Sequence, residues 1–195
     1  TVTINVVGNN CDDESSPNPV LVTQVNAPIL FGQPSVDTVT VAGFNSADVA
    51  TKYPGSYENL RIVGGMYSHD STTASSTWTC DASNLVKAVN LSGVTGDGSY
   101  TMPAITAAEY ASALGKAVSY QEQLAGTRVY SDGTRVDFIT APHGCQSPSQ
   151  TQYIPTISTQ VQTASVSAAG TNHDIVKVSG LPATLPTDWK VVVKG

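Results

Sequence analysis

Three cysteines and three histidines are the residues of this chain best suited to covalent or metal chemistry. The cysteines are Cys11, Cys80 and Cys145, and the histidines are His69, His143 and His173. The cysteines form no Cys-x-x-Cys pair and the histidines lie in separate segments, so the spacing predicts no zinc or copper site. In an oxidising compartment we expect one internal disulfide and one leftover thiol, and any two of the three cysteines are candidates for the bond.

Two of the histidines lie in segments that invite comparison with hydrolytic sites. His69 and Asp70 precede Ser71, but a catalytic triad needs three groups that the fold brings together, which adjacency in a polar loop does not provide. Residues 138–145, Phe-Ile-Thr-Ala-Pro-His-Gly-Cys, superficially resemble the histidine motif of chymotrypsin-like serine proteases, but no Gly-Asp-Ser-Gly motif follows them. We therefore expect no catalytic residue, no cofactor and no metal site, and a protein that is not an enzyme.

The charge composition restricts the partners of the chain. Charged residues make up 12% of the 195 residues, about half the ~25% of an average soluble domain. Nine lysines and arginines and a net charge of −6 argue against nucleic-acid binding. No apolar run approaches the ~20 residues of a membrane-spanning helix, so we expect no membrane insertion. The start at Thr1 and the polar composition predict an extracellular or cell-surface protein from which a leader has been removed.

Short segments in which apolar and polar residues alternate predict β-strands. They lie at residues 1–7, 20–25, 36–41, 60–63, 161–166, 174–178 and 189–193. One α-helix is predicted over residues 106–125, because Thr106 and Glu109 form a Thr-x-x-Glu capping box and apolar residues follow at helical spacing before Gly126. We therefore predict an all-β fold, an immunoglobulin-like or jelly-roll β-sandwich with one inserted α-helix at about residues 106–125. Residues 11–195 are assigned to a single β-sandwich domain, and residues 1–10 to a separate N-terminal strand.

A β-hairpin is predicted around Asp132 and Gly133, because this dipeptide favours a two-residue turn in which both residues adopt positive φ. Such a turn pairs Val129 with Val136 and places Arg128 opposite Asp137 on the other face.

The N-terminal strand is the feature with the largest functional consequence. Val2, Ile4 and Val6 alternate with polar residues, and Cys11 follows closely. A strand of this kind can add to the open edge of a neighbouring subunit and seat alternate side chains in its groove. In these residues the chain resembles the subunits of chaperone–usher pili. The resemblance implies an incomplete immunoglobulin-like sandwich that polymerises by donor-strand exchange, with Val2, Ile4 and Val6 as the subunit contacts.

The leading functional hypothesis is a non-enzymatic extracellular structural or adhesive subunit that assembles by strand addition into a surface filament, such as a pilus or fimbria. Its partner is a second copy of the chain, and host or surface glycans are further candidate partners. One alternative is a virion coat, spike or tail protein of jelly-roll type. Another is a secreted carbohydrate-binding module, for which Trp78 is a candidate aromatic contact.

Overall fold

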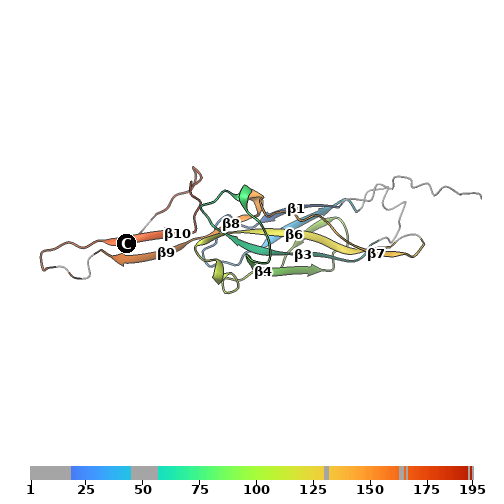
Figure 1. Cartoon of the computed structure of the whole chain (residues 1–195), viewed down its shortest axis with the longest axis horizontal. Coiled ribbons are helices and arrows are strands. Elements are labelled where there is room, and N and C mark those ends of the chain that lie inside the picture. The colour runs from blue at the N-terminus through green and yellow to red at the C-terminus, as the bar shows by residue number, and fades with distance from the viewer. Residues whose placement is uncertain are drawn as a thin grey trace, which may run out of the picture.

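The computed structural model describes residues 19–44, 57–129, 132–162, 165, 167–192 and 194. This part of the chain is mostly β-structure without an α-helix, and its strands form three antiparallel sheets (Figure 1). The all-β prediction is confirmed. Val2, Ile4, Val6 and Cys11, on which the strand-addition hypothesis depends, lie outside the described residues. Within the described ranges, no helix is long and apolar enough to span a membrane.

The first sheet has the strand order β1–β2–β5, and the second has the order β4–β3–β6–β7, with β8 also paired to β6. The strands of the first sheet are β1 (Val20–Val25), β2 (Asp37–Ala42) and β5 (Gly98–Thr101). Those of the second are β3 (Tyr57–His69), β4 (Leu85–Ser92), β6 (Lys116–Val129), β7 (Arg135–Ile139) and β8 (Thr151–Ile154). The described ranges also contain three short 3-10 helices, η1 (Ser75–Thr77), η2 (Ala111–Ala113) and η3 (Pro148–Gln150).

The third sheet is a two-stranded ribbon of β9 (Thr156–Val161) and β10 (Asp174–Ser179), which extends away from the other two sheets (Figure 1). The strand predicted at residues 20–25 is confirmed as β1, and those at 36–41 and 174–178 are confirmed within one residue as β2 and β10. The strand predicted at 161–166 is wrong for its described residues after Val161, where β9 ends, and residues 163, 164 and 166 lie outside the described part of the chain. The one predicted at 189–193 is also wrong for its described part, 189–192.

The first two sheets share one hydrophobic core. Alternate residues of β1 point inward, so Leu21 and Val25 are buried while their neighbours in the strand are exposed. The same cluster includes Val39 of β2, Ile62 of β3 and Leu124 of β6. Each buried side chain of this size stabilises the fold by roughly 1.5–3 kcal/mol relative to its exposed state. The core therefore holds the two sheets against each other, and any polar group on these inner faces is removed from water.

The α-helix predicted at residues 106–125 is wrong, although its first hydrogen bonds do form. The backbone nitrogen and the hydroxyl of Thr106 donate to Oε2 of Glu109 at 2.9 and 3.0 Å, as in a capping box. The chain then makes only a turn and the single 3-10 turn η2. Gly115, with φ of +76°, ends this segment, and β6 begins at the next residue.

The misleading signal was a spacing of four residues, as between Tyr110, Leu114 and Val118. A step of four places two residues on one side of a helix, but four is also a multiple of the strand period of two. Pairing with other strands decides that this segment is a strand and not a helix, because β6 is paired with β3, β7 and β8 along its length.

The hairpin formed by β6 and β7 is confirmed, but its register differs by one residue from the prediction. Val129 lies opposite Arg135, and Arg128 lies opposite Val136. The loop between the last paired residues is therefore longer than two residues. Asp137 consequently accepts a hydrogen bond from the hydroxyl of Thr127 at 2.7 Å instead of facing Arg128.

Candidate functional site

A disulfide joins Cys80, in the loop after β3, to Cys145, in the loop after β7. Their Cα atoms lie 5.9 Å apart, and the bond closes a sequence separation of 65 residues. Closing a loop of this length in the unfolded chain is worth about 4 kcal/mol in the chain-entropy description. The structure thus selects one of the three pairs that the sequence left open.

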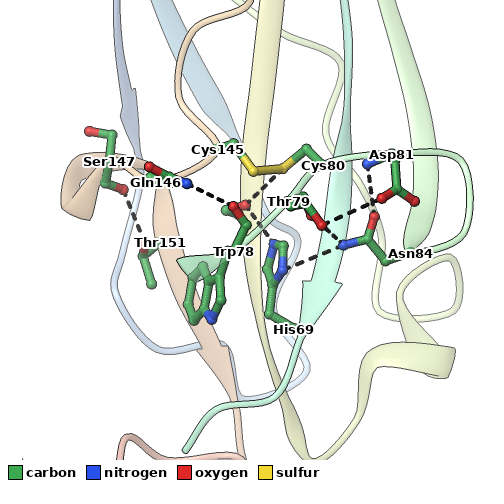
Figure 2. The surroundings of a disulfide bond; sticks show 11 residues. His69, Trp78, Thr79, Cys80, Asp81, Asn84, Cys145, Gln146, Ser147 and Thr151 are labelled. Carbon is green, nitrogen blue, oxygen red and sulfur yellow. Dashed lines mark hydrogen bonds between the residues drawn. A yellow bond between two sulfur atoms is a disulfide. The ribbon is translucent and has the colours of Figure 1, made fainter. Parts of the chain in front are cut away.

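His69 lies beside this disulfide, in the surroundings shown in Figure 2. Its Nε2 is 2.8 Å from the hydroxyl of Ser119, and its ring stacks on Trp78 with centroids 4.3 Å apart. Burial lowers the pKa of His69 to about 4, so the ring is neutral at physiological pH. Asp70 does not orient His69, because its carboxylate accepts hydrogen bonds from Thr72. This arrangement contains no catalytic triad.

The ligand atoms of His69, Cys80 and Cys145 lie within 4.8 Å of one another. Metal binding by cysteine requires the thiolate form, and both sulfur atoms are bonded to each other here. Trp78 is only 4% exposed, so it offers no surface on which a sugar ring stacks. This cluster is therefore a buried structural support under the loop that carries Cys145.

A second polar cluster lies inside the core, on the inner faces of the first two sheets. Its members are Thr23 of β1, Asp37 of β2, Glu122 of β6, His143 of the loop after β7, and Gln150 of η3. Thr23 is 1% exposed, and Asp37, Glu122 and Gln150 are completely buried. Buried carboxyl groups are expensive to desolvate and are rare in a core unless they have a structural or chemical role.

The strand register explains why two of these side chains meet. In the antiparallel pairing of β1 with β2, Thr23 lies opposite Val39 and Asp37 lies opposite Val25. Thr23 and Asp37 are therefore diagonal neighbours on the same inward face, a relation that places Cα atoms ~7–8 Å apart.

The same logic places His143 beside Glu122. Their backbones form an isolated antiparallel bridge, in which each nitrogen donates to the other residue's carbonyl oxygen at 2.9 Å. Residues directly opposite in such a bridge project to the same face. The loop after β7 therefore presents the imidazole on the face where Glu122 points.

Hydrogen bonds join Thr23 and Gln150 to other members of the cluster. The Thr23 hydroxyl lies 3.2 Å from Nδ1 of His143, within hydrogen-bonding distance. Nε2 of Gln150 donates to Oδ1 of Asp37 at 3.0 Å. The hydroxyl of Ser149 donates to the backbone oxygen of Thr23 at 3.0 Å, which ties the residue before Gln150 to the strand that carries Thr23. The Thr23 hydroxyl with the imidazole of His143, and the buried carboxamide of Gln150, are thus held in one region.

No donor from outside the two carboxyl groups reaches four oxygens of this cluster among the described residues: both carboxyl oxygens of Glu122, Oδ2 of Asp37 and Oε1 of Gln150. Glu122 and Asp37 lie within hydrogen-bonding reach of each other, so a protonated Glu122 can donate to Asp37. Burial raises the pKa of Glu122 to about 10, and the neighbouring negative charge of Asp37 contributes. Burial also raises the pKa of Asp37, although the amide of Gln150 opposes that shift. At neutral pH Glu122 is therefore a protonated acid, available to donate a hydrogen bond inside the core.

Gly144 allows these groups to approach one another. Its φ is +112°, and a Cβ built on it would lie 2.6 Å from the backbone oxygen of Tyr120. The same point is 3.2 Å from both Cγ of Gln150 and Oε2 of Glu122. Any larger residue would push the loop away from β6 and separate the carboxamide from the acid.

An adjacent polar network shows what a purely structural arrangement looks like in this core. The hydroxyl of Tyr120 donates to Ser35, Ser35 donates to Gln152, and Gln152 donates to Asn26. These buried groups form a continuous chain, which is the usual state of polar groups in a native core. The unsatisfied oxygens around Glu122 depart from that state and mark the cluster as the candidate site.

Sequence reasoning missed four of the five members and considered His143 only in a segment that resembles a protease histidine motif. The available signal was a polar residue in the inward phase of an otherwise apolar strand. Thr23 falls between Leu21 and Val25 in this way, and Glu122 falls between Tyr120 and Leu124. Glu122 was hidden further because its segment was predicted to be helical.

Comparison with protein-family models, with curated protein sequences and with solved structures finds no match for this chain. The geometry of the candidate site is therefore the basis on which a function is proposed.

Proposed function

We propose that this protein is an extracellular structural or adhesive subunit whose β-sandwich is closed by a covalent ester, which the chain forms within itself between Oγ1 of Thr23 and Cδ of Gln150. The single observation that carries the proposal is a group in which a buried hydroxyl lies beside a half-buried histidine, together with a buried carboxamide that has an unsatisfied oxygen and two buried carboxyl groups. A nucleophile next to a base, with an acid beside the electrophile, is the arrangement that acyl transfer requires.

The reaction follows from the roles that the groups can take. His143 accepts the proton of the Thr23 hydroxyl, and Oγ1 attacks Cδ of Gln150. Protonated Glu122 stabilises the negative charge that develops on Oε1, while Asp37 holds the departing nitrogen through Nε2. The C–N bond breaks and the proton from Thr23 leaves on the nitrogen, so the products are one ester and one molecule of ammonia.

Burial argues against an outside substrate. The nucleophile, the electrophile and both carboxyl groups are enclosed in the core, so the reacting partners are both supplied by this chain. The reaction takes place once per molecule, and the protein is not an enzyme in the sense of acting repeatedly on another molecule. This fits the expectation of a structural role.

A bond between Thr23 and Gln150 suits a protein under mechanical load. It would join β1, the first strand of the described chain, to the turn η3 that precedes β8. Force that enters through β1 would then reach the second sheet through a covalent bond instead of through the hydrogen bonds between β1 and β2. The disulfide and the low charge are compatible with an extracellular location.

The test is the intact mass of the purified protein. The wild-type chain, after reduction of its disulfide, should be lighter than its sequence mass by one ammonia, and a peptide map should contain a linked pair of peptides carrying Thr23 and Gln150. The Thr23→Val variant should show the full sequence mass, and Thr23→Ser should restore the loss because it keeps the hydroxyl. A wild-type mass equal to the sequence mass would contradict the proposal.

The proposal includes assembly by strand addition, with Val2, Ile4 and Val6 of one copy bound to a neighbour. An apolar groove of about 720 Å³ runs along the β9–β10 ribbon and includes Phe31 and Ile157 in its lining. The described chain enters β1 at the end of the molecule opposite this ribbon (Figure 1). Strand addition into this groove would be a head-to-tail contact between copies, a geometry that produces open filaments.

Sedimentation of the full chain tests this assembly. Removal of residues 1–8 should leave a folded but monomeric protein, and Ile157→Asp should have the same effect because this exposed side chain lines the groove. Ser158→Asp, at the next exposed position of the same strand, is the matched control and should still assemble. Unimpaired polymerisation after removal of residues 1–8 would refute strand addition.

A further inference from the structure

The loop between β7 and β8 carries two of the groups proposed to react. His143 and Gln150 both belong to it, and Cys145 lies between them in sequence and bonds to Cys80. The position of the base relative to the carboxamide therefore depends on how this one loop is fastened to the sheet.

The loop is attached to β6 at its edge and on one of its faces. At the edge, the backbone of His143 is bonded to that of Glu122 in both directions at 2.9 Å. The disulfide lies against Ser119, whose hydroxyl is 3.4 Å from Sγ of Cys80. Ser119 and Glu122 project to opposite faces because side chains alternate along a strand, and Gly144 makes the sharp turn between the two attachments.

The other end of the disulfide is fixed by its own contacts, shown in Figure 2. Trp78 stacks on His69 of β3, and Nδ2 of Asn84 donates to the backbone oxygen of Thr79 at 2.6 Å. Gln146, in the loop between β7 and β8, donates to the backbone oxygen of Trp78 at 2.9 Å. Cys80 is thus a fixed point on the sheet, and the disulfide transmits that fixed position to the loop with His143.

We propose that the Cys80–Cys145 disulfide positions His143 and Gln150 for cross-linking, so that the disulfide forms first and the ester follows at full rate only in the oxidised chain. This inference rests on the proposed function and adds the condition under which the reaction takes place. In the first step the two thiols lose two electrons and two protons to a disulfide oxidant, which is reduced to thiols. The second step is the ester formation described above, with release of ammonia.

The physical reason is orientation. With both cysteines reduced, the loop keeps its hydrogen bonds to Glu122 and Trp78 but loses its covalent attachment, so the imidazole and the carboxamide sample more positions. A misplacement of about 1 Å between reacting groups slows an intramolecular reaction by about a hundredfold. In the reducing compartment where proteins are synthesised the chain would form the ester only slowly, and most cross-linking would follow export to an oxidising one.

Cell-free synthesis of the full chain allows both steps to be followed by intact mass. In glutathione disulfide, the wild-type chain should lose one ammonia rapidly after the disulfide forms. In dithiothreitol, the loss should be slower by about tenfold to a hundredfold, and later addition of oxidant should restore the fast rate. The double variant Cys80→Ser/Cys145→Ser should react slowly in both conditions, and oxidant should not rescue it.

A stability control separates positioning from a general loss of folding. Ile62→Ala removes buried volume from the core on β3, outside the loop, and keeps both cysteines, so it should react at the wild-type rate in oxidant. An equal slowing of Ile62→Ala and the double variant would overturn the positioning role. Equal rates for the wild type in dithiothreitol and in oxidant would also overturn it. If the oxidised wild-type chain forms its disulfide but never loses ammonia, the ester itself is refuted and the inference falls with it.

Discussion

Glu122 provides the most direct test of the reasoning about the site, because a protonated carboxyl group in the core must make stability depend on pH. The background is Thr23→Val, in which no ester can form, and the perturbation is Glu122→Gln, which keeps the size of the side chain and removes its titration. Between pH 7 and pH 9 the unfolded chain carries an ionised Glu122, whereas in the folded chain the pKa of Glu122 is raised to about 10. The folded state therefore binds one proton more than the unfolded state, and the free energy of unfolding falls as pH rises.

The size of the effect follows from linkage. One proton of difference corresponds to ~1.4 kcal/mol per pH unit, so Thr23→Val should lose up to about 3 kcal/mol between pH 7 and pH 9. The Thr23→Val/Glu122→Gln variant should show a flat profile over this range. Urea denaturation followed by the fluorescence of the buried Trp78 measures both free energies.

Glu109→Gln in the same background is the matched control. Its hydrogen bonds to Lys87 and Thr106 lower the pKa of this exposed glutamate to about 2, so it is ionised in both states throughout the range. It should leave the slope unchanged. Parallel profiles for Thr23→Val and Thr23→Val/Glu122→Gln would show that Glu122 is ionised in the fold, and the role of Glu122 as the acid would be wrong.

Three further predictions concern other residues of the two clusters. The pKa of His69 is lowered from 6.5 to about 4, so the wild-type chain should lose up to ~3 kcal/mol as pH falls through this interval, and His69→Gln should show little of that loss in thermal melts. Gly144→Ala should destabilise the fold by at least ~1–3 kcal/mol and abolish the ammonia loss. Gly133→Ala, also at positive φ but with open space around it, should destabilise the fold by ~1 kcal/mol and still lose ammonia as the wild type does. Asp37→Asn should prevent cross-linking because the amide of Gln150 loses its carboxylate acceptor, and intact mass would show the full sequence value.

Local periodicity was sufficient for the parts of the fold in which neighbouring residues decide the structure. The alternation of Leu21, Thr23 and Val25 with polar or exposed neighbours predicted β1 with its observed bounds. Gly133 adopts the positive φ expected of a hairpin turn. The observed strand register nevertheless differs by one residue from the predicted register, because a loop of a different length is also compatible with these residues. The segment after Gly115 was misassigned because its apolar spacing fits two periods, and only pairing with β3 distinguishes them.

The amino-acid sequence by itself determined that the chain is rich in β-strands, low in charge and able to form one disulfide from three cysteines, because these properties depend on composition and on patterns a few residues long. Tertiary structure alone decided that Cys80 pairs with Cys145, and that Thr23, Glu122 and Gln150 share one buried region. These groups come from separate strands and loops, so their meeting depends on which edges pair and in what register. The chemistry at the site arises from the removal of water around Glu122 and Asp37, a condition that exists only after the two sheets have packed.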